Sequence, residues 1–485
     1  MYRNKGTITV FLSLISMLFL SLFCTMAESV RVQAARFQAA AAFDMGLFSV
    51  FGEYDRVLLE EYDLWFLDGS SEEQKIREVL ETKLEKYIQP NINPRYNLAA
   101  GRSWDVFPTE LDRCTVDKYA LATDHGGQVF YSQAVENQKE LFVGEAASAL
   151  KKNIKQMEEG HQKGEEYQNE EQKADEEYQR AQAAQMEEKK RQESEKENAE
   201  KQEESDTDIK ETEAVQAKVE NPLDQIKKIK SMGILGLVLK DGTVVSDKTI
   251  ERKNLPSERN LQKGSLLVDE ISADPVSEAI FLNYLQKHFQ CAVDEGGKHQ
   301  KGSKEHSLSY ELEYIIGGQK SDRENLKKTV NRILLIREGM NYATLAKSAK
   351  MRGEAMALAA AITGAAALPE FAGALQKLLM LAWAYGESLL DVRTLLAKGK
   401  VPMLKAETEW KLPLEKLGML AEVLKECDAG GGNGQSYEDY LSGLLILGKK
   451  QQRNLRVLDL IECNRRMEKG GETFRVDALV AQAEA

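Results

Sequence analysis

Hydrophobic residues fill the start of the chain and then give way to an alternation with polar ones. Between Lys5 and Glu28 there is no charged residue, and Leu, Ile, Phe, Val and Met make up most of this run. A helix of about 22 residues rises about 33 Å, which matches the roughly 30 Å hydrocarbon core of a bilayer. The pattern therefore predicts one transmembrane helix at the N-terminus.

The helical pattern continues where the apolar run ends. No Gly or Pro occurs from Thr7 to Met45, and the continuation ESVRVQAARFQAAAAFD is rich in residues of high helix propensity. We predict one rod of about 39 residues, half in lipid and half outside it. Its alanines would let a neighbouring helix approach closely, or would simply favour an exposed helix, and both interpretations stay open. They are Ala34, Ala35, Ala39, Ala40, Ala41 and Ala42.

The residues around the apolar run set the expected topology. Arg3 and Lys5 precede it, so the positive-inside rule places the N-terminus in the cytoplasm and the bulk of the chain outside. The alternative is a signal peptide cleaved at residues 25–27 (Thr-Met-Ala), but the apolar run is longer than a usual signal-peptide core. Phe23 stands where a lipoprotein signal needs a small residue before Cys24. We expect an uncleaved, single-pass anchor in the cell membrane.

Residues 51–150 predict a mixed α and β part. The stretch 72–88 has an apolar stripe at helical spacing, and Ser70 or Ser71 would cap this helix. Pro90 and Pro94 would end it. The stripe comprises Val79, Leu80, Leu84 and Ile88.

Between residues 151 and 220 Glu, Lys, Gln, Asp and Ala take over, and Leu, Phe and Trp disappear. Pairs such as Glu176 with Arg180 have the acid first at i,i+4 spacing, which favours a helix. No sustained heptad of Leu or Ile provides a seam, so a coiled coil is the minor alternative. We expect a solvated helix or a partly disordered linker, which is either a spacer or a tolerated insertion.

Two β features are predicted within residues 221–320. Asp241-Gly242 lies between apolar runs, which is a strong signal for a β-hairpin. Residues 307–316 alternate apolar and polar side chains and predict a half-buried strand that ends at Gly317-Gly318. The apolar positions of that strand are Leu308, Tyr310, Leu312 and Tyr314.

Capping residues predict helices in the rest of the chain. Each capping pair places a side-chain acceptor, or a proline, at the first turn. The pairs are Asp274 with Pro275, Ser321 with Glu324, and Ser436 with Asp439. The Ala-rich stretch 354–390 predicts two buried helices rather than a second membrane span, because Gly364, Pro369 and Lys377 interrupt it.

No catalytic, cofactor-binding or metal-binding constellation emerges from the sequence. His288, Cys291, His299 and His306 fall within one stretch, but their spacing matches no zinc template. We therefore predict no catalytic residue, no cofactor and no metal, and a non-enzymatic role.

Net charge bears on the possible partners of the protein, and cysteine content bears on possible disulfides. The formal net charge of −13 argues against nucleic acid, which requires a basic face. Cys114, Cys291, Cys427 and Cys463 would allow two disulfides in an exported chain, or would stay unpaired.

Several stretches resemble an uncharacterised family from Gram-positive bacteria that is associated with tight-adherence (Tad) type pilus loci and has a pseudopilin-like N-terminus. They are KGTITVFLSLI, CTMAESVRVQAARFQAAAAFDMGLFSVFGEYDRVLLEEYDLWFLD, ILGLVLKDGTVVSDK, YELEYIIGG, AWAYGESLLDVRTLLAKGKVP and LDLIECNRR. Pilin-type leaders have Gly before the cut and Glu five residues later. Here Gly6 is followed by Phe11 at that place, and the next acid is Glu28, so the anchor is expected to stay uncut.

The resemblance implies an accessory or pseudopilin-like component of a Tad-like pilus or secretion assembly. Its partners would be the membrane and the proteins of that assembly, with homo- or hetero-oligomers formed through the N-terminal helix. The alternative is an anchored extracytoplasmic receptor or scaffold unrelated to pili, which would use the charged segment as a spacer.

The fold class we predict is mainly α with a small β component. We divide the chain into a transmembrane, pilin-like helix (1–50), an extracytoplasmic α+β part (51–150), a charged helical or disordered linker (151–220), an α+β part with a hairpin (221–320) and a helical part (321–485).

Overall fold

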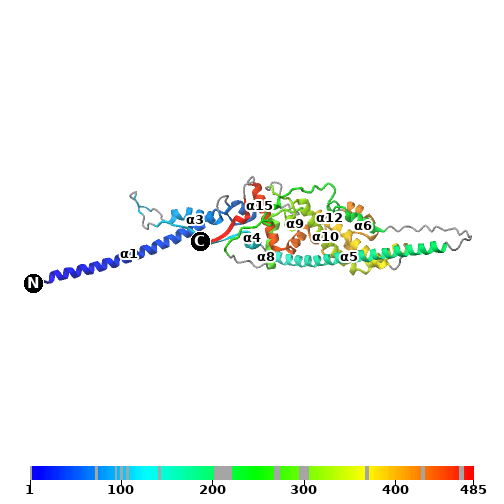
Figure 1. Ribbon diagram of the computed structural model, residues 1–485, viewed down its shortest axis with the longest axis horizontal. Coiled ribbons are helices and arrows are strands. Elements are labelled where there is room, and N and C mark those ends of the chain that lie inside the picture. Colours follow the sequence, from blue (N-terminus) through cyan, green and yellow to red (C-terminus); the bar gives the residue numbers. More distant parts are fainter. Residues whose placement is uncertain are drawn as a thin grey trace. The chain divides into compact units, whose positions relative to one another are not determined.

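The computed structural model of this chain describes residues 3–70, 75–92, 96–98, 102–104, 109–139, 144–200, 221–266, 274–293, 305–365, 371–427, 432–468 and 474–484. The fold is mainly helical with a small β-sheet, which confirms the predicted fold class (Figure 1). The chain forms two units, and segments distant in sequence contribute to each. Unit 1 comprises 1–137, 259–271 and 468–485, and unit 2 comprises 138–258 and 272–467.

The core of unit 1 lies between two helices, α1 (Arg3–Phe51) and α3 (Ile76–Ile92). On α3 the predicted stripe residues Leu80, Leu84 and Ile88 are buried, at the i,i+4 spacing that places them on one face. They pack against the end of α1, at Ala42 and Val50.

One glycine makes this helix pair possible. A Cβ atom on Gly46 would lie 2.6 Å from Cγ1 of Ile88, so any larger residue there would push the helices apart. The prediction that Pro90 ends α3 is wrong, because the helix continues to Ile92. Pro90 falls in the last turn, where its missing N–H costs a single hydrogen bond. Ser71 and Pro94 lie outside the described residues.

A three-stranded sheet completes unit 1. Its strands are β1 (Leu67–Asp68), β4 (Lys118–Leu121) and β5 (Leu479–Glu484), in the order β1-β5-β4 with both pairs antiparallel. The most C-terminal strand is therefore the central one, and Leu67 pairs with Val480. A separate hairpin joins β2 (Tyr96–Leu98) and β3 (Arg102–Trp104). The other helices of unit 1 are α2 (Arg56–Tyr62) and α4 (Asp124–Gln138).

Unit 2 is a helical assembly around α12 (Ala372–Leu396), in which every residue from Leu378 to Leu395 is buried. Helices packed around it include α5 (Gly144–Glu200), α6 (Pro222–Ser231), α7 (Ile234–Val238), α10 (Asp322–Lys347), α11 (Ala349–Ala365) and α13 (Leu420–Glu426). The unit also contains α8 (Pro275–His288), α9 (Glu311–Gly317), α14 (Tyr437–Leu447) and α15 (Lys450–Glu468).

The charged segment is a long helix, but the first half of it is not solvated. Along α5 the buried positions follow a regular seam with alternating steps of four and three residues. The seam faces α10, α12 and α14. The prediction of a solvated helix or linker is therefore wrong for this half, while residues 201–220 lie outside the described part. The buried seam residues are Asn153, Met157, Gly160, Gly164, Tyr167 and Ala174.

Both β features predicted within 221–320 are wrong. Residues 234–238 form the short helix α7, because Ile234, Leu237 and Val238 are buried at helical spacing. A turn does occur at Asp241-Gly242, with a φ of 85° at Gly242, but it joins no pair of strands.

The predicted strand 307–316 contains helix α9 instead, and Gly318 ends this helix in the left-handed conformation. The alternation misled because Glu311 and Glu313 are also fully buried, so the polar positions do not form a solvent face.

The capping predictions are confirmed more often than the β features. Asp274 accepts a hydrogen bond from the Ser277 amide at the start of α8, and Ser321 accepts one from the amide of Glu324. Ser436 and Asp439 form a reciprocal capping box. The final helix is two helices, α14 and α15. Of the two Ala-rich helices, α12 is buried from Leu378 to Leu395, whereas α11 buries only one stripe, so the prediction of two buried helices is wrong for α11.

Candidate functional site: the N-terminal helix

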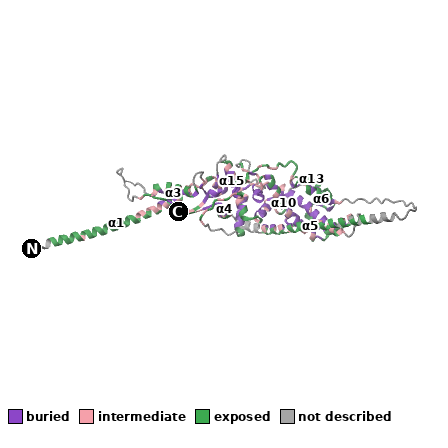
Figure 2. Ribbon diagram, in the orientation of Figure 1, coloured by how far each residue is buried: buried purple, intermediate pink, exposed green. Residues whose placement is uncertain are grey.

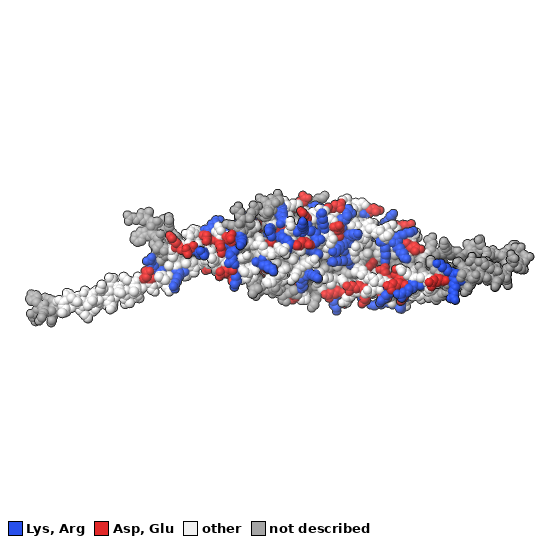
Figure 3. Space-filling model, in the orientation of Figure 1, with Lys and Arg blue, Asp and Glu red and all other residues white. Residues whose placement is uncertain are grey.

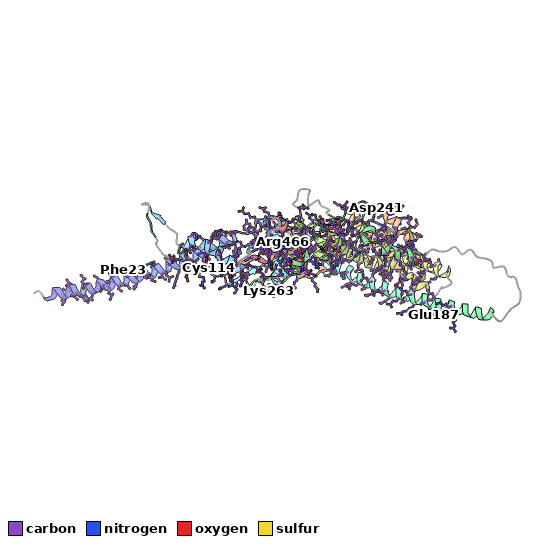
Figure 4. The ribbon with its side chains drawn as sticks, turned by 45° about the horizontal axis from the view of Figure 1, so that its top comes forward. Phe23, Cys114, Glu187, Asp241, Lys263 and Arg466 are labelled. Atoms are coloured by element: carbon purple, nitrogen blue, oxygen red, sulfur yellow. The ribbon has the colours of Figure 1, made fainter. Side chains whose placement is uncertain are left out.

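The first half of α1 is exposed in the described part of the structure. In the part of the chain that the structure describes, Gly6–Phe51 is the one helix long and apolar enough to cross a membrane, and the apolar window within it is not buried. Its large side chains project outward, as Phe23 does in Figure 4. Figures 2 and 3 show this stretch exposed and free of charged side chains along most of its length. The structure thus supplies a helix that would fit a single-pass anchor.

Three of the hydroxyl side chains in this stretch form hydrogen bonds within the helix itself. Thr9, Ser13 and Thr25 donate hydrogen bonds to carbonyl oxygens three residues earlier, at 2.8–2.9 Å. In lipid an unpaired hydroxyl would carry a desolvation cost, and back-bonding removes it. The segment therefore suits a hydrocarbon environment despite its hydroxyl residues.

The second half of α1 is fixed to unit 1 at its base. Gln38 donates a side-chain hydrogen bond of 2.9 Å to the Asn91 carbonyl on α3. Just past the helix, the Glu53 carboxylate accepts a hydrogen bond from the Tyr87 hydroxyl. It also forms ion pairs of 3.3 Å with Lys83 and Lys86. The hydrogen bond from Tyr87, helped by the two lysines, holds the pKa of Glu53 below its usual value. No loop separates the membrane-length segment from this base, so the rod leaves unit 1 in a fixed direction.

The alanine-rich part of the rod has two different faces. Ala42 is buried and Ala39 partly buried against α3, so these two serve packing within unit 1. The opposite face carries a stripe of three exposed apolar side chains, in which Val30, Phe37 and Phe48 are 68%, 77% and 84% exposed and which the exposed Asp44 interrupts between the last two. With 100° per residue these three positions fall within about 20° of one direction. The sequence analysis missed this stripe, although the steps of 7 and 11 residues signal it.

The aromatic residues near the C-terminal end of α1 differ in burial. Phe66 is buried and Phe51 packs against the core of unit 1. Trp65 is half exposed and makes an edge-to-face contact of 4.6 Å between ring centroids with Tyr54.

Unit 2 contains a second cluster of functional groups, a buried ionic network. Arg337 on α10 donates to Asp391 on α12 at 2.8 and 3.0 Å, and Lys405 bridges Asp391 and Glu387. Asn341 adds a hydrogen bond of 2.9 Å to Asp391. All of these side chains are buried.

Charge pairing decides the protonation of this network. Burial alone would raise the pKa of Asp391, but Arg337 and Lys405 outweigh it and hold that pKa below its usual value. For Glu387 burial prevails over Lys405, and the pKa is raised. The network residues do not line the cavity at Leu381 or the cavity at Lys328, and we assign them to fixing the packing of α10 on α12. In the sequence, the buried network is indicated only by Arg337, a charged residue at a core position of α10.

The residues weighed as zinc ligands are engaged elsewhere. The Nδ1 atom of His306 lies 2.8 Å from Glu311, Cys291 donates to the Val293 carbonyl, and His288 packs its ring on Tyr284. His299 lies outside the described residues. The sequence left both two disulfides and no disulfide open, and the structure has no disulfide bond among the five cysteines, all of which lie in its described part.

Comparison with known proteins gives a family and no function. No curated protein and no solved structure matches the chain. Residues 212–485 match a family of unknown function, DUF5702. The match includes β5 of unit 1 and most of unit 2, but not α1 or α5. Because it covers more than half of the 485 residues, the protein belongs to this family of unknown function, DUF5702.

Proposed function

We propose that this protein is a membrane-anchored, non-enzymatic component of a Tad-like pilus or secretion assembly at the cell envelope. The N-terminus would lie in the cytoplasm, residues 6–27 would cross the membrane, and the rest of unit 1 and all of unit 2 would lie on the extracytoplasmic side. The apolar helix α1 would pack laterally against equivalent helices of partner subunits or of a second copy, as in pseudopilin-like proteins.

One observation carries the proposal. Exposed apolar side chains on α1 do not end with the membrane-length segment but recur on the free face at Val30, Phe37 and Phe48, with the exposed Asp44 between the last two. Lipid would cover the first part, and only another apolar surface would cover the second part in water. An anchor that merely tethers a domain has no use for such a continuation. The resemblance of the N-terminal residues to pseudopilin-like sequences points in the same direction.

Photo-cross-linking in the native cell tests the proposal. A photoreactive amino acid at Phe37 or Phe48 should give adducts with another membrane-anchored polypeptide or with a second copy of this chain. The matched control is Arg36, which is also exposed but lies about 100° away from the stripe on the same helix. Equal yields at Phe37 and Arg36, or no protein adduct at either stripe position, would refute lateral packing.

The alternative of an anchored extracytoplasmic receptor or scaffold stays a prediction. It used residues 151–220 as a spacer arm, and α5 packs within unit 2 as far as Ala174, so this first part of the segment is not a free spacer.

A further inference from the structure

A cavity in unit 2 collects positive charge. Its volume is about 370 Å³, and residues from the end of α9, from α10, from α14 and from α15 line it. Five of the lining side chains are cationic, and none of the described residues that line it is acidic. The cations are Lys328, Arg332, Lys449, Arg453 and Arg456. This concentration stands out in a chain whose formal net charge is −13.

Backbone carbonyls hold three of these cations in place. Lys328 donates to the Gly317 carbonyl at 2.9 Å, and Arg332 donates to that of Ile316 at 3.3 Å. Arg456 donates to the carbonyls of Ile315 and Ile316 at 2.9 and 3.0 Å. These carbonyls end helix α9, where the helix dipole is negative. Each of these bonds from an arginine uses only its Nη1 atom, so each guanidinium keeps further donors for a ligand.

The charges of the cavity are not balanced. Arg453 pairs with Glu278 at 2.8 Å. In contrast, within the described part of the chain no carboxylate lies within 4.0 Å of Lys328, Arg332, Lys449 or Arg456. Burial lowers the pKa of Lys328, and the nearby Arg332, Arg456 and Arg252 lower it further. Like charges held together without a counter-ion weaken the fold until an anion joins them.

Capping of α9 explains only part of the arrangement. One or two cations suffice to satisfy the last carbonyls of a seven-residue helix. Capping accounts neither for Lys449, whose side chain makes no carbonyl contact, nor for a cavity that also has apolar walls at Ile316 and Leu444.

We propose that this cavity binds a phosphate group carried on a small organic ester, either a soluble one or a lipid headgroup. The guanidinium groups of Arg332 and Arg456 match the fork geometry of phosphate oxygens, and Lys328 adds a compact charge. Apolar walls and a volume of about 370 Å³ leave room for the organic part.

Thermal unfolding of the full-length protein in a zwitterionic detergent tests the site. Glycerol phosphate at about 10 mM should raise the melting temperature by about 2 °C over chloride at equal ionic strength. The double variant Arg332→Gln/Lys449→Gln should bind glycerol phosphate about tenfold more weakly and lose the shift. Both residues are exposed, so the variant should fold, and the single variant Lys449→Gln provides a second check.

The matched control for the single variant Lys449→Gln is Lys327→Gln, which also removes one positive charge but from an exposed position of α10 outside the cavity. It should keep the full shift. No shift in the wild-type protein, or an equal shift in the wild-type protein and the double variant, would overturn the proposal, as would a shift lost equally in Lys327→Gln.

A second experiment distinguishes a lipid headgroup from a soluble phosphate ester as the ligand. The wild-type protein and the double variant are reconstituted in phosphatidylcholine or phosphatidylglycerol vesicles. Stabilisation by phosphatidylglycerol that the double variant loses assigns a lipid headgroup, and stabilisation by glycerol phosphate alone assigns a soluble ester. A protein that responds to neither phosphate has no such site.

Discussion

Glu313 is a fully buried carboxyl group of unit 2, and among the described residues it forms no ion pair. Its Oε1 atom accepts hydrogen bonds from the Ala292 amide at 2.9 Å and from the Tyr437 hydroxyl at 2.8 Å, while its Oε2 atom is buried without a partner. Burial raises the pKa of Glu313 to about 7, even though both hydrogen bonds favour the ionised form. The protonated acid therefore suits this site better than the carboxylate does.

We predict that Glu313→Gln makes unit 2 relatively more stable as the pH rises. The folded protein binds the proton of Glu313 up to about pH 7, whereas the unfolded chain releases it near its ordinary value. The wild-type free energy of unfolding therefore falls between these two pH values, by about 3 kcal/mol for this group. Glutamine stays neutral, so the stability of the variant minus that of the wild type should grow over this range and level off above it.

Denaturant unfolding followed by tryptophan fluorescence, measured from pH 4 to pH 9, checks this prediction. The control is Glu354→Gln on the exposed side of α11, which should give a difference of at most about 0.5 kcal/mol at every pH. A Glu313→Gln difference that does not change with pH would contradict the assigned protonation.

Single residues also show which features the sequence reveals. Caps such as Asp274 and Ser436 were predicted because each bonds to an amide within its own first turn. The burial of Glu313 was not predicted, because its hydrogen-bond donor Tyr437 lies 124 residues away in the sequence. Local chemistry is readable from one stretch of sequence, and long-range polar pairing is not.

At the scale of elements, the crossing of α5 over α10 depends on glycine. A Cβ atom on Gly339 would lie 2.3 Å from the Gly164 nitrogen, and a Cβ on Gly164 would lie 2.8 Å from the Leu335 carbonyl oxygen. Gly160 and Gly164 are four residues apart and place bare backbone toward α10, as in a small-xxx-small contact. The two helix backbones therefore touch directly.

We predict that Gly339→Ala destabilises unit 2 by about 1–3 kcal/mol, since the added methyl group meets backbone that cannot move aside. Thermal unfolding checks this value. Gly353→Ala on α11 is the matched control, because a Cβ there meets nothing within 4 Å. The control should be neutral or stabilising by up to about 1 kcal/mol. Equal effects of the two substitutions would show that helix packing does not set the cost.

The same crossing explains why the charged helix was misjudged. Its heptad seam is real, but glycine, asparagine and a single tyrosine fill positions where Leu or Ile would have signalled a coiled coil. Close approach of small residues buries little apolar side chain, so a hydrophobic pattern cannot reveal it. The wrong prediction of a strand at α9 has a different cause. There the regular alternation of apolar and polar residues suggested a solvent face, but the two glutamates on it are buried.

At the scale of the whole molecule, the chain returns to unit 1 after building unit 2. Residues 259–271 and 468–485 belong to unit 1, and β5 supplies the central strand of its sheet. Gly264 donates a hydrogen bond of 2.9 Å to Asp124, which fixes the first of these returning segments next to α4. That these two segments belong to unit 1 could not be predicted from composition, because strand order depends on pairing between distant segments.

The proposed membrane attachment and the proposed lateral packing would use different parts of α1, so truncation should separate them. Residues 6–27 are exposed apart from the half-buried Ile15, and none of them belongs to the core of unit 1. A chain that lacks residues 1–27 should therefore appear in the soluble fraction with an unchanged melting temperature, because the packing of Ala42 and Val50 on α3 remains. The full-length variant Phe37→Ser/Phe48→Ser should stay in the membrane fraction but lose the protein adducts proposed above. Cell fractionation and circular dichroism distinguish these outcomes. A truncated chain that remained membrane-bound would place the anchor elsewhere, and a double variant released from the membrane would mean that the stripe binds lipid rather than protein.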